Sequence, residues 1–299
     1  MPCVPRSILV LLALSLFGMQ ASADRRDVFL ATPEGGQIAA TLERPDGAPA
    51  PVVLLLHGFT GDRHEMPVKG TNLGIFEHLA EALRDAGLAS LRIDFRGNGE
   101  SSGAFLDTTI GRQIEDAWRA IDWLQTSDLV DGQKIAVLGW SQGGLVAAHL
   151  AANNPDLASV TLWAPVISPS LTAQRQLGAR AYETALSSKP NRVITSFMPW
   201  GKEIRLRARY FQEAALHSAT GAIAHFPGPL HVVAARRDNV IVPPVQSAQS
   251  LLTYHRGEQA LTVINSDHVW NGLEGPDVLR TELIPPTVSF ISQWFKSTH

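Results

Sequence analysis

The chain has 299 residues, of which 45% are hydrophobic and 18% charged, and its formal net charge is −3 at pH 7. This length and composition suit one large α/β domain or two small ones with a buried core. The weak negative charge gives no reason to expect a nucleic-acid partner. Cys3 is the only cysteine, so a chain that loses its N-terminus would contain no disulfide, Cys-ligated metal or thiol nucleophile.

The first 23 residues have the pattern of a secretory signal peptide. Arg6 precedes an apolar run over residues 8–17, and Ala21-Ser22-Ala23 supplies the small residues of a cleavage site, so we expect cleavage before Asp24. The apolar run is shorter than the roughly 20 residues of a membrane-spanning helix, although an uncleaved anchor is the alternative. We therefore predict an exported protein, periplasmic or secreted, with no membrane partner after cleavage. Its domain would cover residues 24–299, with a net charge of −3 − 1 = −4.

Predicted strands and helices alternate after Asp24. The expected strands are residues 28–30, 37–43, 52–56, 89–95, 134–138, 160–163, 230–235 and 261–264. One expected helix begins at Asn72 and is stopped by Gly87; the others are residues 110–124, 144–152, 245–254 and 288–295, the last after the Pro285-Pro286 break. The continuous apolar run at 52–56 is typical of a strand buried on both faces. This alternation predicts a mostly parallel sheet with helices on both faces.

About sixty residues between Trp163 and Leu230 interrupt this alternation. Residues 204–210 alternate apolar and basic side chains, which predicts a half-exposed strand that pairs with residues 193–198 as a hairpin. We expect the insertion, about 166–228, to form a cap over a site at the edge of the sheet. It carries eight Lys and Arg against three Glu, or +5. Two interpretations stay open: the basic side chains recruit substrate, or they are a solvated strand face.

Gly139-Trp140-Ser141-Gln142-Gly143 is the most informative stretch of the chain. A predicted strand precedes it and an alanine-rich predicted helix follows, and in this context the G-x-S-x-G pattern indicates a nucleophile elbow. The strained turn needs small neighbours, which the glycines provide. Ser141 is therefore the candidate nucleophile. The alternative is a Gly-rich turn whose serine only caps the helix.

A serine nucleophile needs a base, and the base needs a carboxylate that holds its tautomer. In folds with such an elbow the acid and then the histidine follow the serine, each after a later strand. Asp238 comes just after the strand 230–235, and His268 just after the strand 261–264. Order and position thus predict Ser141, Asp238 and His268 as the catalytic residues.

Other titratable residues fit these roles less well. Asp267 would have to fold back on its neighbour to reach His268, so we interpret it as a turn residue. Asp94 ends a strand before the elbow and is interpreted as structural. Four other histidines fit less well: His255 lies at a predicted helix end, and His217, His225 and His231 lie in or beside the insertion and lack a strand-end position. No group of residues has the spacing of a zinc site, and no metal or cofactor is expected.

An acyl-transfer site also needs donors for the oxyanion. The backbone N–H of Gln142, directly after the nucleophile, is one candidate. The other is the backbone N–H of Phe59, in the loop after the strand 52–56, where Gly58 permits a sharp bend. We interpret His57 as a residue that shapes this loop. Trp140 and Trp163 both lie at strand ends, so they are candidates for lining a substrate pocket.

Together these motifs resemble the α/β-hydrolases across the whole mature length. The sequences HGFTG at 57–61, DFRGNGES at 94–101 and WSQGG at 140–144 are similar to those of the cinnamoyl and feruloyl esterase-like subgroup. This resemblance implies an α/β-hydrolase fold with a mostly parallel eight-stranded sheet and a small, hairpin-bearing cap after the sixth strand. A tryptophan precedes the nucleophile where the subgroup usually has histidine, so the resemblance supports the triad more than the substrate.

The implied activity is a serine carboxylic ester hydrolase that works through an acyl-enzyme on small or aromatic acyl esters, hydroxycinnamoyl esters among them. The expected partner is a small-molecule ester. Two alternatives remain: an amide-cleaving, lipase-type or thioesterase-type hydrolase of the same fold, and a non-catalytic binding protein on this scaffold. An amide-cleaving serine aminopeptidase would need an acidic anchor for a substrate ammonium, which the basic insertion does not favour.

Overall fold

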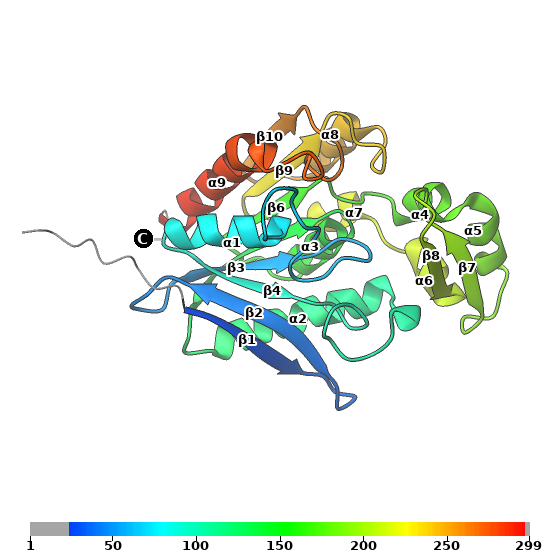
Figure 1. Cartoon of the computed structure of the whole chain (residues 1–299), viewed down its shortest axis with the longest axis horizontal. Coiled ribbons are helices and arrows are strands. Elements are labelled where there is room, and N and C mark those ends of the chain that lie inside the picture. The colour runs from blue at the N-terminus through cyan, green and yellow to red at the C-terminus, as the bar shows by residue number, and fades with distance from the viewer. Residues whose placement is uncertain (1–23, 297–299) are drawn as a thin grey trace, which may run out of the picture.

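A sheet of eight strands forms the centre of the computed structural model, which describes residues 24–296 (Figure 1). The strand order is β1-β2-β4-β3-β5-β6-β9-β10. In that order the strands are Asp24–Ala31, Gln37–Arg44, Ala89–Ile93, Pro51–Leu56, Asp131–Trp140, Ser159–Trp163, Leu230–Ala235 and Gln259–Ile264. β2 runs antiparallel to both neighbours, and the pairs from β4 through β10 are all parallel. The predicted mostly parallel sheet is therefore confirmed.

The central strands are buried on both faces, as their continuous apolar runs predict. Residues 52–56 of β3 have no exposed surface, and β9 is buried along its whole length. Because β3, β5, β6, β9 and β10 are parallel, their carboxyl ends meet at one edge of the sheet. Loops that follow these strands are thereby brought together, and ligand sites of open α/β sheets lie at such an edge.

Helices cover both faces of the sheet (Figure 1). α1 (Ile75–Asp85) and α9 (Ile284–Lys296) pack on one face, and α2 (Ile110–Thr126), α3 (Gln142–Ala152) and α8 (Pro244–Tyr254) on the other. α1 begins three residues later than the sequence indicates. Gly74 is its N-cap, and the Glu77 carboxylate accepts a hydrogen bond of 2.9 Å from the Gly74 N–H. This capping satisfies a donor that the helix itself leaves free.

Six short elements lie between β6 and β9. They are α4 (Pro169–Leu177), α5 (Ala179–Leu186), β7 (Val193–Phe197), β8 (Glu203–Arg207), α6 (Ala208–Ala214) and α7 (Ala219–Ile223). β7 and β8 form an antiparallel pair separate from the main sheet. In Figure 1, α4, α5, α6 and this hairpin gather at one end of the molecule, whereas α7 returns to pack beside α3.

Two predicted elements differ from the structure. Residues 204–210 were expected to be one strand, but β8 ends at Arg207 and α6 begins at Ala208. The last helix was expected after Pro285-Pro286, yet α9 begins at Ile284 and contains both prolines. A π-helical turn, Leu279–Leu283, comes directly before α9. The prolines lack N–H donors and fall where the hydrogen-bond pattern changes, so the helix tolerates them.

The predicted signal peptide, residues 1–23, lies outside the described residues and stays a prediction. Within residues 24–296, no helix has the length and apolar character needed to cross a membrane.

Candidate active site

Ser141 occupies a sharp turn between β5 and α3. Its φ of +56° lies in the left-handed region, which is strained for a residue with a side chain. A Cβ on Gly139 would lie 2.1 Å from the Gly143 carbonyl oxygen, and one on Gly143 would lie 2.0 Å from the Leu56 carbonyl oxygen. Both flanking positions therefore require glycine, because the turn presses the start of α3 against the ends of β5 and β3.

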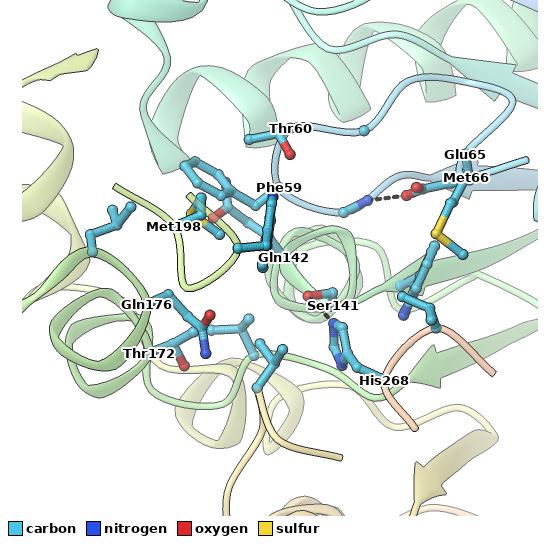
Figure 2. Close-up of a pocket in the computed structure, with 18 of the residues that line it drawn as sticks. Phe59, Thr60, Glu65, Met66, Ser141, Gln142, Thr172, Gln176, Met198 and His268 are labelled. Atoms are coloured by element: carbon cyan, nitrogen blue, oxygen red, sulfur yellow. Dashed lines mark hydrogen bonds between the residues drawn. The ribbon is translucent and has the colours of Figure 1, made fainter. Parts of the chain in front are cut away.

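The three predicted catalytic side chains lie in hydrogen-bonding contact. The Nε2 atom of His268 is 3.1 Å from Ser141 Oγ, and its Nδ1 atom is 2.7 Å from Asp238 Oδ2. Figure 2 shows Ser141 and His268 facing each other at the wall of a pocket. With Nδ1 as donor to the carboxylate, Nε2 is free to accept the proton of the serine hydroxyl, which is the geometry of a nucleophile with a general base.

Asp238 is fixed by its own loop. Its Oδ1 atom accepts hydrogen bonds from the backbone N–H groups of Val240 at 2.7 Å and Ile241 at 2.9 Å, which leaves Oδ2 for His268. Asp267 points elsewhere: its Oδ1 atom accepts from the N–H groups of Val269 and Asn271. Asp238 thus orients the histidine, and Asp267 stabilises the turn that carries it.

The two predicted oxyanion donors, the backbone N–H groups of Gln142 and Phe59, both belong to residues that line the pocket beside Ser141. Gln142 is the first residue of α3, so its N–H has no acceptor within the helix. Phe59 belongs to the loop after β3 and lines the same pocket as Ser141. An ideal Cβ on Gly58 would contact Ser141 Cβ at 3.4 Å, so the loop after β3 lies directly beside Ser141.

Both ring nitrogens of His57 form hydrogen bonds with backbone groups. Its Nε2 atom accepts from the Phe95 N–H at 3.0 Å, and its Nδ1 atom lies 2.8 Å from the Gly58 carbonyl oxygen as a donor. Burial lowers the pKa of His57, which keeps the ring neutral in this tautomer. His57 therefore ties the loop after β3 to the end of β4.

Glu65 is a site residue that the sequence interpretation missed. Its Oε1 atom accepts the hydrogen bond of the Gly58 N–H, which fixes the loop one residue before Phe59. Burial raises the pKa of Glu65 to about 8, so the carboxyl group is mainly protonated at neutral pH. Its position eight residues after His57 carries no signal in a single sequence, because charged residues are common in such loops.

The pocket beside Ser141 has a volume of about 630 Å³ (Figure 2). Its walls are mostly apolar, with Met66, Val166 and Leu177 among them, and Trp140 lines it as predicted. The prediction for Trp163 is wrong. That side chain is completely buried, and its indole N–H donates to Thr287 Oγ1 on α9 at 3.0 Å. The strand end places Trp163 beneath α9 on the face opposite α3, away from the pocket.

Comparison with known proteins supports the fold. A family model described as alpha/beta hydrolase fold matches residues 51–185, from β3 into α5. Est1E from Butyrivibrio proteoclasticus, solved with ferulic acid bound, has a TM-score of 0.67 and 19% sequence identity. The match covers 90% of this chain and 98% of that chain. The protein has the α/β-hydrolase fold. The esterase Pf2001 from Pyrococcus furiosus is similar to this chain with a TM-score of 0.65 and 21% identity, over 91% of this chain and 93% of that one.

Curated relatives match a shorter part of the chain. An uncharacterized 31.7 kDa protein of Escherichia coli, from the traX-finO intergenic region, is 35% identical over 108 residues. That match covers 36% of this chain and 35% of the relative. Acylamino-acid-releasing enzyme 2 of Oryza sativa subsp. japonica is 30% identical over 115 residues, which are 37% of this chain and 14% of that enzyme. The matches thus span about a third or less of these relatives' lengths.

The segment between β6 and β9 supplies part of the wall of the pocket beside Ser141. Thr172 and Gln176, four residues apart on α4, lie together in the pocket, and Met198 adds an apolar side chain (Figure 2). Trp200, at the turn between β7 and β8, lines the mouth of the pocket and is 62% exposed. None of these residues follows a strand of the main sheet, so no positional rule indicated them.

The basic side chains of β8 and α6 are partly neutralised. Arg207 and Arg209 both pair with Asp107 of the short helix Phe105–Asp107. Lys202 and Arg205 instead line a second groove of about 500 Å³, with Thr60 and Gly61 on its other wall. Among residues 24–296, no cluster of three His, Cys, Asp or Glu side chains could hold a metal ion.

Proposed function

We propose that this protein is a serine carboxylic ester hydrolase that works through an acyl-enzyme. The observation that carries the proposal is the relay of Ser141, His268 and Asp238, with distances of 3.1 Å and 2.7 Å, at the wall of a pocket of about 630 Å³. A binding protein on this scaffold would have no need of a buried carboxylate that orients a histidine toward a strained serine.

The first half-reaction forms the acyl-enzyme. Ser141 Oγ attacks the ester carbonyl while His268 Nε2 takes the hydroxyl proton, and Asp238 stabilises the resulting imidazolium. The charge that develops on the carbonyl oxygen is stabilised by the N–H groups of Phe59 and Gln142. When the tetrahedral intermediate collapses, the C–O bond to the alcohol breaks, and His268 returns the proton to the departing oxygen.

The second half-reaction repeats these steps with water. His268 takes a proton from the water molecule that attacks the acyl carbonyl, and the same two amides stabilise the second tetrahedral intermediate. Collapse then breaks the bond to Ser141 Oγ, which recovers its proton from His268. The carboxylic acid leaves, and the enzyme returns to its starting state.

The lining of the pocket supports apolar or aromatic acyl groups as substrates. Its surfaces are mainly aliphatic and aromatic, while Thr172 and Gln176 supply polar groups from α4. The sequence motifs resemble those of cinnamoyl and feruloyl esterases, and Est1E, which shares the fold, was solved with ferulic acid bound. Hydroxycinnamoyl esters are therefore the first aromatic substrates to test.

Amide hydrolysis is the second candidate, because a segment of the chain is 30% identical to acylamino-acid-releasing enzyme 2 of rice. An aminopeptidase would hold the substrate ammonium on a carboxylate in the pocket. Two carboxyl groups line this pocket, Asp62 and Glu65. Burial raises the pKa of Glu65 to about 8, so at neutral pH it is mainly uncharged, and the Oδ1 atom of Asp62 already accepts the backbone N–H groups of His64 and Glu65. These two features favour the ester over the free amino-terminal amide.

The deciding experiment compares initial rates of residues 24–299 on methyl ferulate and on p-nitrophenyl butyrate, with Ser141→Ala as the blank. Serine-dependent turnover of the ferulate at a comparable or faster rate would support a hydroxycinnamoyl esterase. Turnover of the butyrate alone would support a general short-acyl esterase. Activity retained by Ser141→Ala would contradict the proposed nucleophile. Ser141→Ala should keep the melting temperature of the wild type. Alanine carries a Cβ as serine does, so the backbone strain at this turn stays the same.

We also propose that the enzyme is exported, on the basis of the apolar run at 8–17 and the small residues at 21–23. The expected product after secretion begins at Asp24. Mass spectrometry of the intact protein from the cytoplasmic, periplasmic and extracellular fractions of an expressing bacterium tests this, and an uncleaved chain in the membrane fraction would support the anchor instead.

A further inference from the structure

Tyr210 links the segment between β6 and β9 to both predicted oxyanion donors. It lies on α6, which follows the hairpin of β7 and β8, and it is 4% exposed at the pocket wall. Its hydroxyl group donates to the side-chain oxygen of Gln142 at 2.7 Å. Its ring contacts the ring of Phe59, with centroids 5.6 Å apart. One side chain from the insertion therefore touches both residues whose N–H groups are the predicted oxyanion donors.

The bond from Tyr210 continues into the main domain. The Gln142 side-chain amide donates to Gln113 Oε1 on α2 at 2.7 Å, and Gln142 and Gln113 are 4% and 2% exposed. The chain Tyr210–Gln142–Gln113 thus runs through the interior from α6 across the start of α3 to α2. Burial raises the pKa of Tyr210, so its hydroxyl keeps its proton and acts as the donor. The Gln142 side chain is thus held from both sides, by the Tyr210 hydroxyl and by the Gln113 amide.

The Phe59 side is held by aromatic packing. The Phe59 ring lies between Tyr210 and Phe105, whose ring centroid is 5.4 Å away. Offset and tilted ring pairs at this separation are attractive and restrict the position of the residue that carries the ring. Since the Phe59 N–H belongs to the same residue, the packing also restricts where that donor points.

The rest of α6 is anchored to the same part of the domain. Glu213, three residues after Tyr210, accepts the Gly111 N–H of α2 at 3.1 Å. Arg209, directly before Tyr210, pairs with Asp107 at 3.5 Å. These two contacts hold α6 against the start of α2 and involve neither Gln142 nor Phe59. The helix therefore has anchors of its own, apart from the contacts that Tyr210 makes with Gln142 and Phe59.

We propose that Tyr210 is a positioning residue that sets the geometry of the oxyanion hole, through its hydroxyl on the Gln142 side chain and its ring on Phe59. This inference rests on the proposed acyl-transfer function and adds that the insertion is part of the catalytic apparatus as well as a wall of the pocket. Loss of the hydroxyl leaves both N–H groups in place but less restrained. The cost falls on the transition state, where the carbonyl oxygen becomes charged, more than on substrate binding.

The test uses the full domain with p-nitrophenyl butyrate and the variants Tyr210→Phe and Tyr182→Phe. Tyr182 is a matched control: it is 5% exposed on α5 in the same insertion and does not line the pocket. We expect Tyr210→Phe to lower kcat by about 10- to 100-fold, less than deletion of an oxyanion donor, with KM within about twofold of the wild type. Tyr182→Phe should change kcat by less than about twofold.

A transition-state analogue distinguishes positioning from a general structural role. Butylboronic acid forms a tetrahedral adduct with the serine oxygen, so its affinity should fall by the same factor as kcat/KM in Tyr210→Phe. Gln142→Met keeps the backbone donor and removes the side-chain link; it should resemble Tyr210→Phe, and the double variant should lose little more than either single one.

Three results would overturn the inference: equal kcat values for the two tyrosine variants, an effect of Tyr210→Phe on KM alone, or additive losses in the double variant. Failure of the proposed acyl-transfer function would give a different result. Turnover would then persist in Ser141→Ala, which keeps Tyr210. Should Tyr210→Phe unfold, Gln142→Met and its inhibition by butylboronic acid decide the question alone.

Discussion

Asp238 and Asp267 sit on the two loops that meet at His268, and their hydrogen bonds assign them different roles. Asp238 reaches Nδ1 of the histidine, while Asp267 accepts two backbone N–H groups of its own turn. Asp238→Asn should lower kcat by about 10³- to 10⁴-fold, because the amide cannot hold the tautomer that leaves Nε2 as the base. Asp267→Asn should stay within about tenfold of the wild type.

Steady-state kinetics of the two aspartate variants on one activated ester check this assignment. Thermal unfolding serves as the control, since Asp267 shapes a turn and its loss affects stability as well. A larger loss of kcat in Asp267→Asn than in Asp238→Asn, at equal melting temperatures, would mean that the acid has been assigned to the wrong residue.

Glu65 gives the activity a pH dependence of its own. Its pKa of about 8 means that the carboxyl group is neutral below that pH and negative above it. A negative charge beside the Gly58 N–H opposes the charge that forms on the oxyanion, so kcat/KM should fall as the pH rises through about 8. Glu65→Gln keeps an oxygen acceptor for the Gly58 N–H and should remove this fall.

Profiles of kcat/KM between pH 5 and pH 10, corrected for spontaneous hydrolysis, measure the effect. Wild type and Glu65→Gln should have the same profile on the acidic side and differ only on the alkaline side, where Glu65 loses its proton. Identical alkaline limbs would show that Glu65 does not titrate in the active site.

At the level of single residues, position after a strand was the useful signal in the sequence. Ser141, Asp238 and His268 each follow a parallel strand, and parallel strands end at the same edge, so their proximity could be predicted. Trp163 also ends a strand, but it belongs to β6 itself and its side chain points under α9. Tyr210 and Glu65 reach the site through buried hydrogen bonds, and single sequences carry no pattern for such pairs.

At the level of elements, the hairpin of β7 and β8 determines where the positive charge of the insertion lies. Asp107 pairs with Arg207 and Arg209. Arg205 instead lines the second groove, together with Thr60 and Asp62 of the loop after β3 and with Glu203. Asp107→Asn should therefore raise kcat/KM for an ester that carries a carboxylate by about two- to fivefold at low ionic strength. The gain should disappear in 0.5 M salt, where screening is nearly complete beyond a few ångström.

An uncharged ester of the same size is the control, and its kcat/KM should not respond to salt or to the substitution. A flat salt profile for the anionic ester in both proteins would mean that the basic side chains are only a solvated surface. The two interpretations of the basic insertion are separated by this measurement.

The boundary between β8 and α6 shows where sequence periodicity stops being informative. Ala208 and Tyr210 continue the alternation of buried positions set by Ile204 and Leu206, so a strand was predicted through Tyr210. The chain instead turns into a helix that buries Ala208, Tyr210 and Phe211 against the domain. Over so few residues, a strand and a short helix give similar patterns of apolar and polar side chains. Tertiary packing then decides which of the two forms.

For the whole molecule, the sheet could be predicted because its strands are long, apolar and separated by amphipathic helices. The confirmed fold depends on these regular units. Within residues 164–229 only the hairpin of β7 and β8 could be predicted. The rest of the path could not, because its helices are short and bury their apolar sides against several different elements. Short segments gain little stability alone, and their structure depends on the surface that they cover.

The buried His231 gives the whole fold a predicted sensitivity to acid. It lies in β9, with Nε2 2.9 Å from Thr262 Oγ1 and its ring 4.9 Å from that of Phe290 on α9. Burial lowers its pKa to about 4, whereas in the unfolded chain it would titrate near 6.5. Between these values the unfolded state binds a proton that the folded state does not, so the free energy of unfolding falls as the pH drops through this window.

Urea unfolding at pH 7 and at pH 4.5 measures this contribution. In the wild type His231 should account for a loss on the order of 2 kcal/mol between the two conditions, given that each pKa unit corresponds to about 1.4 kcal/mol. His231→Gln retains a polar partner for Thr262 and cannot take up the proton, so it should be less stable at pH 7 but lose less on acidification. An equal loss in both proteins would place the acid-sensitive group elsewhere, and His149, whose pKa burial also lowers to about 4, would be the next residue to replace.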